Sequence, residues 1–193
     1  PKIISFSNEQ FYNNELKVMT SLESLKMDDS IELVRTNGQR NSSGCNEEEA
    51  RLILRKVKSI INAERNLNNE LAQSIGILSP FRDQVEYLAS LISKEIDFGD
   101  IQKHDIACGT AYSFQGEERD IMLLSFAVDE KSHHSAFRHL NKEDVFNVSV
   151  TRARSRQIVY VSFSNTFNPG VNLYAYISHI ESKIEVEVPE IGK

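Results

Sequence analysis

The stretch IMLLSFAV at residues 121–128 decides the fold class, together with QIVYVSF at residues 157–163. Both runs are apolar at most positions rather than at every second one. A strand of this kind needs cover on both faces, as in a parallel sheet with helices on either side. The two runs therefore predict buried central strands of an α/β domain.

The segments around these strands alternate between helix and strand patterns. Apolar residues from position 50 to position 61 recur at three- and four-residue intervals, which predicts an amphipathic helix. Asn46 is its expected N-cap, with Glu49 three residues later as in a capping box. A second helix is expected to start at Ser79-Pro80, because proline suits the first helical position. Strands alternating with helices predict βαβ units and a mainly parallel sheet.

The remaining segments are shorter or more polar. Residues 31–34 and 74–78 are strand-like, and a short strand is expected to end near Thr110. Residues 129–139 are expected to form a polar loop, followed by a helix from about Asn141 and a last helix at residues 171–180. The expected organisation is one domain at residues 1–180 and a charged tail or linker at residues 181–193.

Length and charge exclude several classes. The 193 residues suit one domain, and the charge sum of 22 − 28 = −6 excludes a generally basic nucleic-acid coat but not a local basic patch. No apolar run approaches the roughly 20 residues that span a bilayer. The two cysteines are far apart, so no disulfide framework is expected. These features predict a cytoplasmic protein with no membrane partner.

The loop TAYSFQGEERD (residues 110–120) is the first of three segments that suggest chemistry. It is rich in hydrogen-bonding side chains, among them Thr110, Gln115 and Glu118, and Gly116 suits a tight turn. Loops that follow the carboxyl ends of parallel strands face the ligand crevice. The alternative is a polar surface loop without a ligand.

The second segment, FNVSVTRARSR (residues 146–156), carries three arginines with no acid among them. On a helix, Val148 and Arg152 share a face, so Arg152 is expected near a helix end. Clustered guanidinium groups at Arg152, Arg154 and Arg156 suit phosphate binding through forked hydrogen bonds. The alternative is a solvated basic helix end, stabilised by the helix dipole.

The third segment, GILSPFRDQ (residues 76–84), places Ser79, Pro80 and Arg82 at a strand-to-helix junction. Exposed amides at a helix start attract anions such as a nucleic-acid phosphate. The alternative is plain helix capping.

In their order and spacing the three segments resemble motifs IV, V and VI of the second RecA-like domain of superfamily 1 DNA/RNA helicases. GILSPFRDQ resembles motif IV, TAYSFQGEERD motif V and FNVSVTRARSR motif VI. The branch that contains the nonsense-mediated-decay RNA helicase is the most similar. PKIISFSNEQFYNNEL (residues 1–16) and NEEEA (residues 46–50) also resemble that branch, so the resemblance covers about residues 1–164. It implies a RecA-like α/β fold without a phosphate loop of its own.

The resemblance implies a nucleotide site shared between two lobes. ATP and Mg²⁺ would be bound mainly by a first, N-terminal RecA-like domain that this chain lacks. Arg152 would be the arginine finger, and Glu118 a nucleotide contact in a loop shaped by Gln115 and Gly116. Arg154 would be a second phosphate-side group or a structural ion pair.

The resemblance also implies a track for single-stranded DNA or RNA. Thr110 and Ser79, with Pro80 and Arg82, would contact the phosphodiester backbone. Two residues depart from the family pattern. Tyr112 stands where the family commonly has Asp, and Glu117 stands where it commonly has Arg or Lys, and both changes fall in the loop that the resemblance implies for coupling to the nucleic acid.

The sequence contains no GxxxxGK[ST] phosphate loop and no DExx-type magnesium motif. Both are needed for phosphoryl transfer in this class. We therefore expect negligible ATPase activity from the chain alone. Two alternatives stay open: a non-catalytic nucleic-acid-binding or protein-interaction module with a RecA-like fold, and a nucleotide-binding α/β domain outside the helicases. A metal site at His133 and His134 is not expected, because no familiar ligand spacing completes it.

Overall fold

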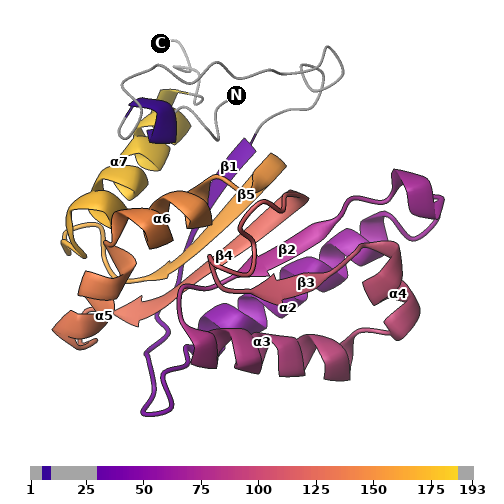
Figure 1. The fold of residues 1–193 in the computed structure, drawn as a ribbon, viewed down its shortest axis with the longest axis horizontal. Helices are drawn as coiled ribbons and strands as arrows, with labels where there is room; N and C mark the ends of the chain where they lie inside the picture. Colours follow the sequence, from indigo (N-terminus) through magenta and orange to yellow (C-terminus); the bar gives the residue numbers. More distant parts are fainter. Residues whose placement is uncertain (1–5, 10–29, 187–193) are drawn as a thin grey trace, which may run out of the picture.

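Five parallel strands form one sheet in the computed structural model, which describes residues 6–9 and 30–186 (Figure 1). The strand order is β1-β5-β4-β2-β3, so β4 lies at the centre. The strands are β1 (Ser30–Arg35), β2 (Ile75–Leu78), β3 (Ala107–Gly109), β4 (Arg119–Asp129) and β5 (Ala153–Ser162). All four pairings are parallel. The predicted α/β fold with a parallel sheet is confirmed.

Helices cover both faces of the sheet, which explains why β4 and β5 are apolar on both sides. On one face, α2 (Glu47–Ala63) and α3 (Arg82–Glu95) pack over Ile121 and Leu123. On the other, α5 (His134–Leu140), α6 (Glu143–Val150) and α7 (Val171–Val186) pack over Met122 and Leu124. Successive residues of β4 therefore face different cores, as the two-residue period of a strand requires. Figure 1 shows α5, α6 and α7 gathered on one side of the sheet.

Two short elements complete the connections, η2 (Asn69–Leu71) before β2 and α4 (Phe98–Lys103) before β3. Phe6, within the described residues 6–9, packs against α7, and the centroid of its ring lies 5.1 Å from that of Tyr176. The rest of the segment at residues 1–16 that resembles the helicase branch lies outside the described residues.

Several predicted boundaries were wrong. The segment expected to be a polar loop contains α5, and the next helix begins at Glu143 rather than near Asn141. The last helix continues to Val186, past the expected end at residue 180. α5 has only seven residues, and a helix this short gives a weak periodic signal.

The start of α3 also differs from the prediction. The helix begins at Arg82 with Phe81 as its N-cap, so Pro80 lies outside it. Ser79 is fully buried, and its Oγ accepts a hydrogen bond from the Phe81 amide at 3.3 Å. This turn between β2 and α3 takes the place of a helix that starts at proline.

A buried polar cluster joins α2 and α3 to the carboxyl ends of β4 and β5. Asn46 caps α2 as predicted, and its Oδ1 accepts from the Glu49 amide at 3.2 Å. The Glu49 carboxylate, however, is fully buried and accepts from Ser125 Oγ (2.7 Å), Ser162 Oγ (2.7 Å) and the Ala127 amide (2.9 Å). The backbone N–H of Asn46, which a capping box would pair with Glu49, instead donates to Gln84 Oε1 of α3 at 2.8 Å. The capping box is therefore only half formed, because strand ends satisfy the acid.

Candidate nucleotide and nucleic-acid sites

The loop at residues 110–118 runs from one edge of the sheet to the other. It leaves β3 after Gly109, which is in register with Leu78 and, through it, with Leu124. It enters β4 at Arg119, five residues before Leu124, which corresponds to roughly 16 Å along a strand. Only the start of the loop therefore lies at the carboxyl edge, where a loop that follows a strand faces the crevice, and its end lies at the amino edge.

The end of this loop meets the start of β5 at the amino edge of the sheet. The Arg119 amide donates to the Arg152 carbonyl oxygen at 3.1 Å. Arg154 forms ion pairs of 3.6 Å with Glu118 and with Asp120. Motif V and motif VI residues that are distant in sequence are thus neighbours at this edge.

Arg152 lies in the link between α6 and β5, not on the helix. α6 ends at Val150 with Thr151 as its C-cap, and β5 begins at Ala153. The Thr151 hydroxyl donates to the Asn147 carbonyl oxygen at 2.8 Å and accepts from Arg152 Nε and Nη2 at 3.2 and 2.8 Å. Strand pairing with β4 draws the backbone out of the helix at this point, a tertiary effect that helical periodicity does not reveal.

The three arginines do not form a free basic cluster. Their two-residue spacing places them on one side of the chain as it enters β5. Arg154 pairs with acids of the motif V segment, and Arg156 Nη2 donates to Glu32 Oε2 of β1 at 3.0 Å. Acids that are absent from the local sequence are supplied by neighbouring segments, so Arg154 and Arg156 are paired residues of a strand, and Arg152 alone lies beside the end of α6.

Gly116 adopts φ +82°, a left-handed conformation that side chains rarely take. A Cβ at this position would meet no atom within 4 Å. The backbone conformation, not lack of space, therefore requires glycine here. Gln115 precedes it as an exposed residue of the same turn.

At the carboxyl edge, motif IV and the start of motif V line one cavity of about 580 Å³. Pro80, Arg82 and Thr110 all line it, and the Arg82 side chain is 86% exposed. Ser79 lies beneath them, buried in the turn before α3. The structure thus brings together three of the four residues predicted to meet nucleic acid.

Comparison with known proteins gives a consistent result. The family described as "AAA domain" matches residues 1–163. The chain belongs to this AAA domain family. The chain is 32% identical over 120 residues to the DNA polymerase alpha-associated DNA helicase A of Saccharomyces cerevisiae, covering 61% of this chain and 16% of that protein. Matches at 27% identity to the putative helicase mov-10-B.1 of Danio rerio and to the helicase SEN1 of Saccharomyces cerevisiae cover 82% and 80% of the chain, but 18% and 7% of those proteins.

These relatives confirm that the AAA domain is a second RecA-like domain of the superfamily 1 helicase type, in the branch named from its motifs. The chain spans less than a fifth of each of the three relatives. None of the helices within residues 6–9 and 30–186 is long and apolar enough to cross a membrane. The same described part of the AAA domain contains no group of three or more His, Cys, Asp or Glu side chains that could hold a metal ion.

Several residues of the AAA domain reach the carboxyl-edge cavity without a sequence motif. The Arg40 guanidinium lies 4.0 Å from the centroid of the Phe81 ring, and its Nη1 donates to the Ala127 carbonyl oxygen at 2.9 Å. His139 Nε2 lies 3.1 Å from the Pro80 carbonyl oxygen. Arg40 and His139 have no signal in the sequence, because they come from the β1–α2 connection and from α5, and only the tertiary structure brings these segments to the cavity.

Tyr112, one of the two departures from the family pattern, is 62% exposed at the same cavity. Its hydroxyl donates to Asp144 Oδ2 of α6 at 3.2 Å. The Asp144 charge and this hydrogen bond raise the pKa of Tyr112. The substitution noted in motif V therefore has a partner in the helix that precedes motif VI.

Proposed function

We propose that this chain is the C-terminal motor domain of an ATP-dependent helicase that acts on single-stranded DNA or RNA. A first RecA-like domain would supply the phosphate loop and the magnesium ligands. The observation that carries the proposal is the separation of two groups of motif residues. Glu118, Arg152 and Arg154 lie at the amino edge of the sheet, while Pro80, Arg82 and Thr110 lie around one cavity at the carboxyl edge.

On the nucleotide side, Arg152 is the proposed arginine finger. Among the described residues, the hydrogen bonds of its side chain go to Thr151 alone, so N–H donors remain for an anionic oxygen. The side chain is half-buried, which lowers its freedom before it meets the ligand. Mg²⁺-bound ATP would supply the phosphoryl group, and Arg152 would stabilise the negative charge on its oxygens.

Glu118 and Arg154 have a different part in this site. Both side chains are about half exposed and form an ion pair, so they fix each other at the edge of the sheet. We assign Arg154 the structural role, because Asp120 and Glu118 already neutralise it. Glu118 keeps carboxylate lone pairs for a ribose hydroxyl, the contact expected from the motif.

On the nucleic-acid side, Thr110 and Arg82 are the proposed phosphate contacts. A hydroxyl and an exposed guanidinium bind the backbone without reading bases, which suits a motor that moves along any sequence. The buried Ser79 hydroxyl shapes the turn that presents Pro80 and Arg82. Because the single loop of residues 110–118 carries Thr110 at one edge and Glu118 at the other, it is the proposed link between nucleotide and strand.

The decisive experiment is Arg152→Ala in the protein that carries this chain together with a phosphate-loop domain. ATP turnover is expected to fall by about 10³-fold, whereas single-strand affinity persists. The matched control is Arg156→Ala, which removes a nearby guanidinium of β5 that pairs with Glu32 instead. Turnover that survives Arg152→Ala would contradict the assignment of Arg152 as the arginine finger. The isolated chain is expected to show no turnover.

A further inference from the structure

A second cavity adjoins the one that motifs IV and V form. It has a volume of about 670 Å³ and lies between the β4–α5 connection, α5 and the loop that leads into α7. His133 lines both cavities, so they meet at this residue. A nucleic-acid strand that crosses Thr110 and Pro80 and continues past His133 would therefore enter the second cavity.

Cations outnumber acids around this cavity, although the chain as a whole is acidic. Lys131 and Arg138 line it, against the single acid Glu130. Both cations are exposed, and within residues 6–9 and 30–186 neither has an ion-pair partner. The Glu130 carboxylate accepts a hydrogen bond from the Ser164 backbone amide at 3.0 Å. Unpaired cations beside a cavity favour an anionic ligand.

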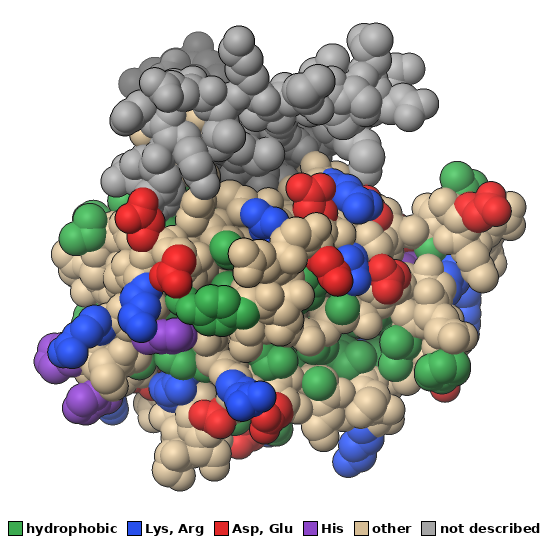
Figure 2. All heavy atoms as spheres, in the orientation of Figure 1, with side chains coloured by type: hydrophobic (Ala, Val, Ile, Leu, Met, Phe, Trp, Pro, Cys, Tyr) green, Lys and Arg blue, Asp and Glu red, His purple; other side chains and the backbone are tan. Residues whose placement is uncertain are grey.

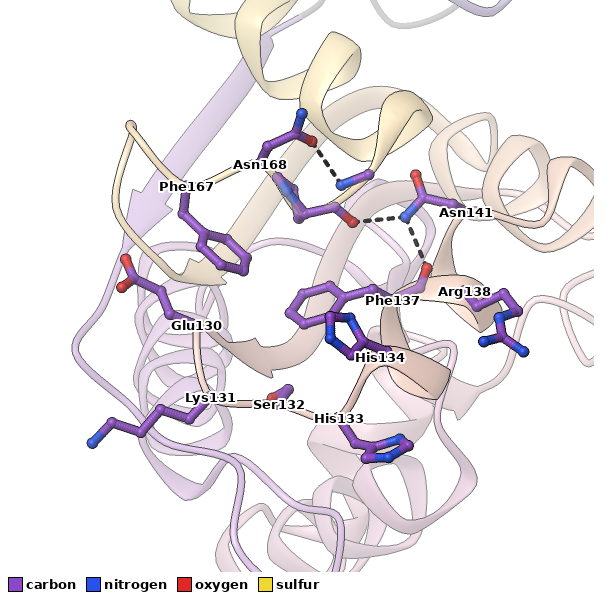
Figure 3. A pocket seen from close by; sticks show the side chains of 12 residues that line it. Glu130, Lys131, Ser132, His133, His134, Phe137, Arg138, Asn141, Phe167 and Asn168 are labelled. Atoms are coloured by element: carbon purple, nitrogen blue, oxygen red, sulfur yellow. Dashed lines mark hydrogen bonds between the residues drawn. The ribbon is translucent and has the colours of Figure 1, made fainter.

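Two aromatic rings line the middle of the cavity. The centroids of Phe137 and Phe167 are 5.5 Å apart, with the rings tilted by 50°, and both residues are half-buried. Figure 3 shows the two rings facing one another, His134 beside Phe137, and Lys131 and Arg138 extending away on opposite sides. Figure 2 shows histidines together with Lys or Arg side chains at this end of the molecule.

An apolar floor between two cations matches the chemistry of a single strand, in which flat bases alternate with phosphates. Continuity with the cavity at Thr110 favours a nucleic acid over an acidic peptide, because the same strand can occupy both cavities. Neither cation belongs to the helicase motifs, so the second cavity is separate from the contacts those motifs imply.

We propose that this cavity is a second binding site for single-stranded nucleic acid, which extends the track beyond motifs IV and V. Lys131 and Arg138 bind phosphates, and Phe137 and Phe167 pack against a base or a ribose. The inference rests on the proposed function, since the strand must first lie across the Pro80–Thr110 cavity.

The test is the double substitution Lys131→Ala and Arg138→Ala in the full protein that carries this chain. Binding of fluorescein-labelled oligo-dT and oligo-U is measured by anisotropy over a range of salt concentrations. The slope of log K against log salt is negative, and each lost phosphate contact reduces its magnitude by about 0.7. The slope of the double variant is therefore expected to be shallower by about 1.4. If the two proteins bind equally at about 1 M salt, this difference in slope makes binding by the variant about 25-fold weaker at about 0.1 M salt.

The matched control is Arg51→Ala with Arg55→Ala, which removes two exposed charges from α2 on the other face of the sheet. This control is expected to leave affinity and slope unchanged. If the Lys131 and Arg138 variant binds as the unmodified protein does while Arg82→Ala weakens binding, the second site is wrong and the motif track stands. If neither change weakens binding, the nucleic-acid part of the proposed function is itself wrong.

Discussion

Substitution of Glu49 is expected to change stability in a pH-dependent way. This carboxylate is fully buried at the ends of β4 and β5. Burial raises its pKa from 4.5 to about 7, although hydrogen bonds from Ser125, Ser162 and the Ala127 amide lower it. The folded protein therefore binds more protons than the unfolded chain between pH 4.5 and about 7. Stability from this group is fully present below pH 4.5 and is lost as the pH rises through 7, by about 3 kcal/mol.

Glu49→Ala removes the acceptor from several buried donors. The Ser162 hydroxyl can turn to Thr36 Oγ1. The Ser125 oxygen accepts a hydrogen bond from Gln84 Nε2, so the Ser125 hydroxyl loses its acceptor. The Ala127 amide is fixed by the backbone and loses its partner. An orphaned buried amide costs about 1–3 kcal/mol and each lost hydrogen bond about 1 kcal/mol, so the variant is expected to be about 3–5 kcal/mol less stable at pH 5.

The difference in free energy of unfolding between the variant and the unmodified chain should shrink as the pH rises, because ionisation of the buried Glu49 destabilises only the unmodified chain. Urea unfolding of the chain, followed by circular dichroism at pH 5, 6, 7 and 8, measures it. At pH 8 the variant is expected to be about 0–2 kcal/mol less stable. Glu70→Gln, an exposed acid in η2, is the control and should leave the pH profile unchanged. Parallel profiles for the Glu49 variant and the unmodified chain would refute the buried-acid argument.

Gly116→Ala is expected to destabilise the chain by about 1 kcal/mol, because the φ angle is +82° at this position. Gly99→Ala within α4 should be neutral or stabilising by up to about 1 kcal/mol, because alanine favours a helix and a Cβ there meets no atom within 4 Å. Urea unfolding of the two variants compares them directly, and equal effects would contradict the conformational reason. Asp144→Asn is expected to lower the pKa of Tyr112, since the carboxylate charge is the main cause that raises it. Ultraviolet titration of tyrosinate, with Tyr112→Phe to identify the signal, measures this; an unchanged titration would place the two side chains apart in solution.

Local sequence was a good guide to the strands and a poor one to the ends of helices. The apolar runs at residues 121–128 and 157–163 became the cores of β4 and β5, because continuous apolar composition leaves few alternatives to a buried strand. The polar composition of residues 129–139 predicts a loop, yet most of α5 lies within this segment. Its polar side chains face outward, and its short length gives little periodicity to read.

The sequence by itself determined the fold class, the order of the three motifs and most of the residues proposed for the site, since these depend on composition and spacing along the chain. Only the tertiary structure decided that Arg152 leaves its helix, that Arg154 is neutralised by Glu118 and Asp120, and that Glu49 ends among strand termini. It also joined α5 to the motif IV and V cavity. Strand pairing and burial bring together groups that are far apart in sequence, and the energy of each group depends on those neighbours.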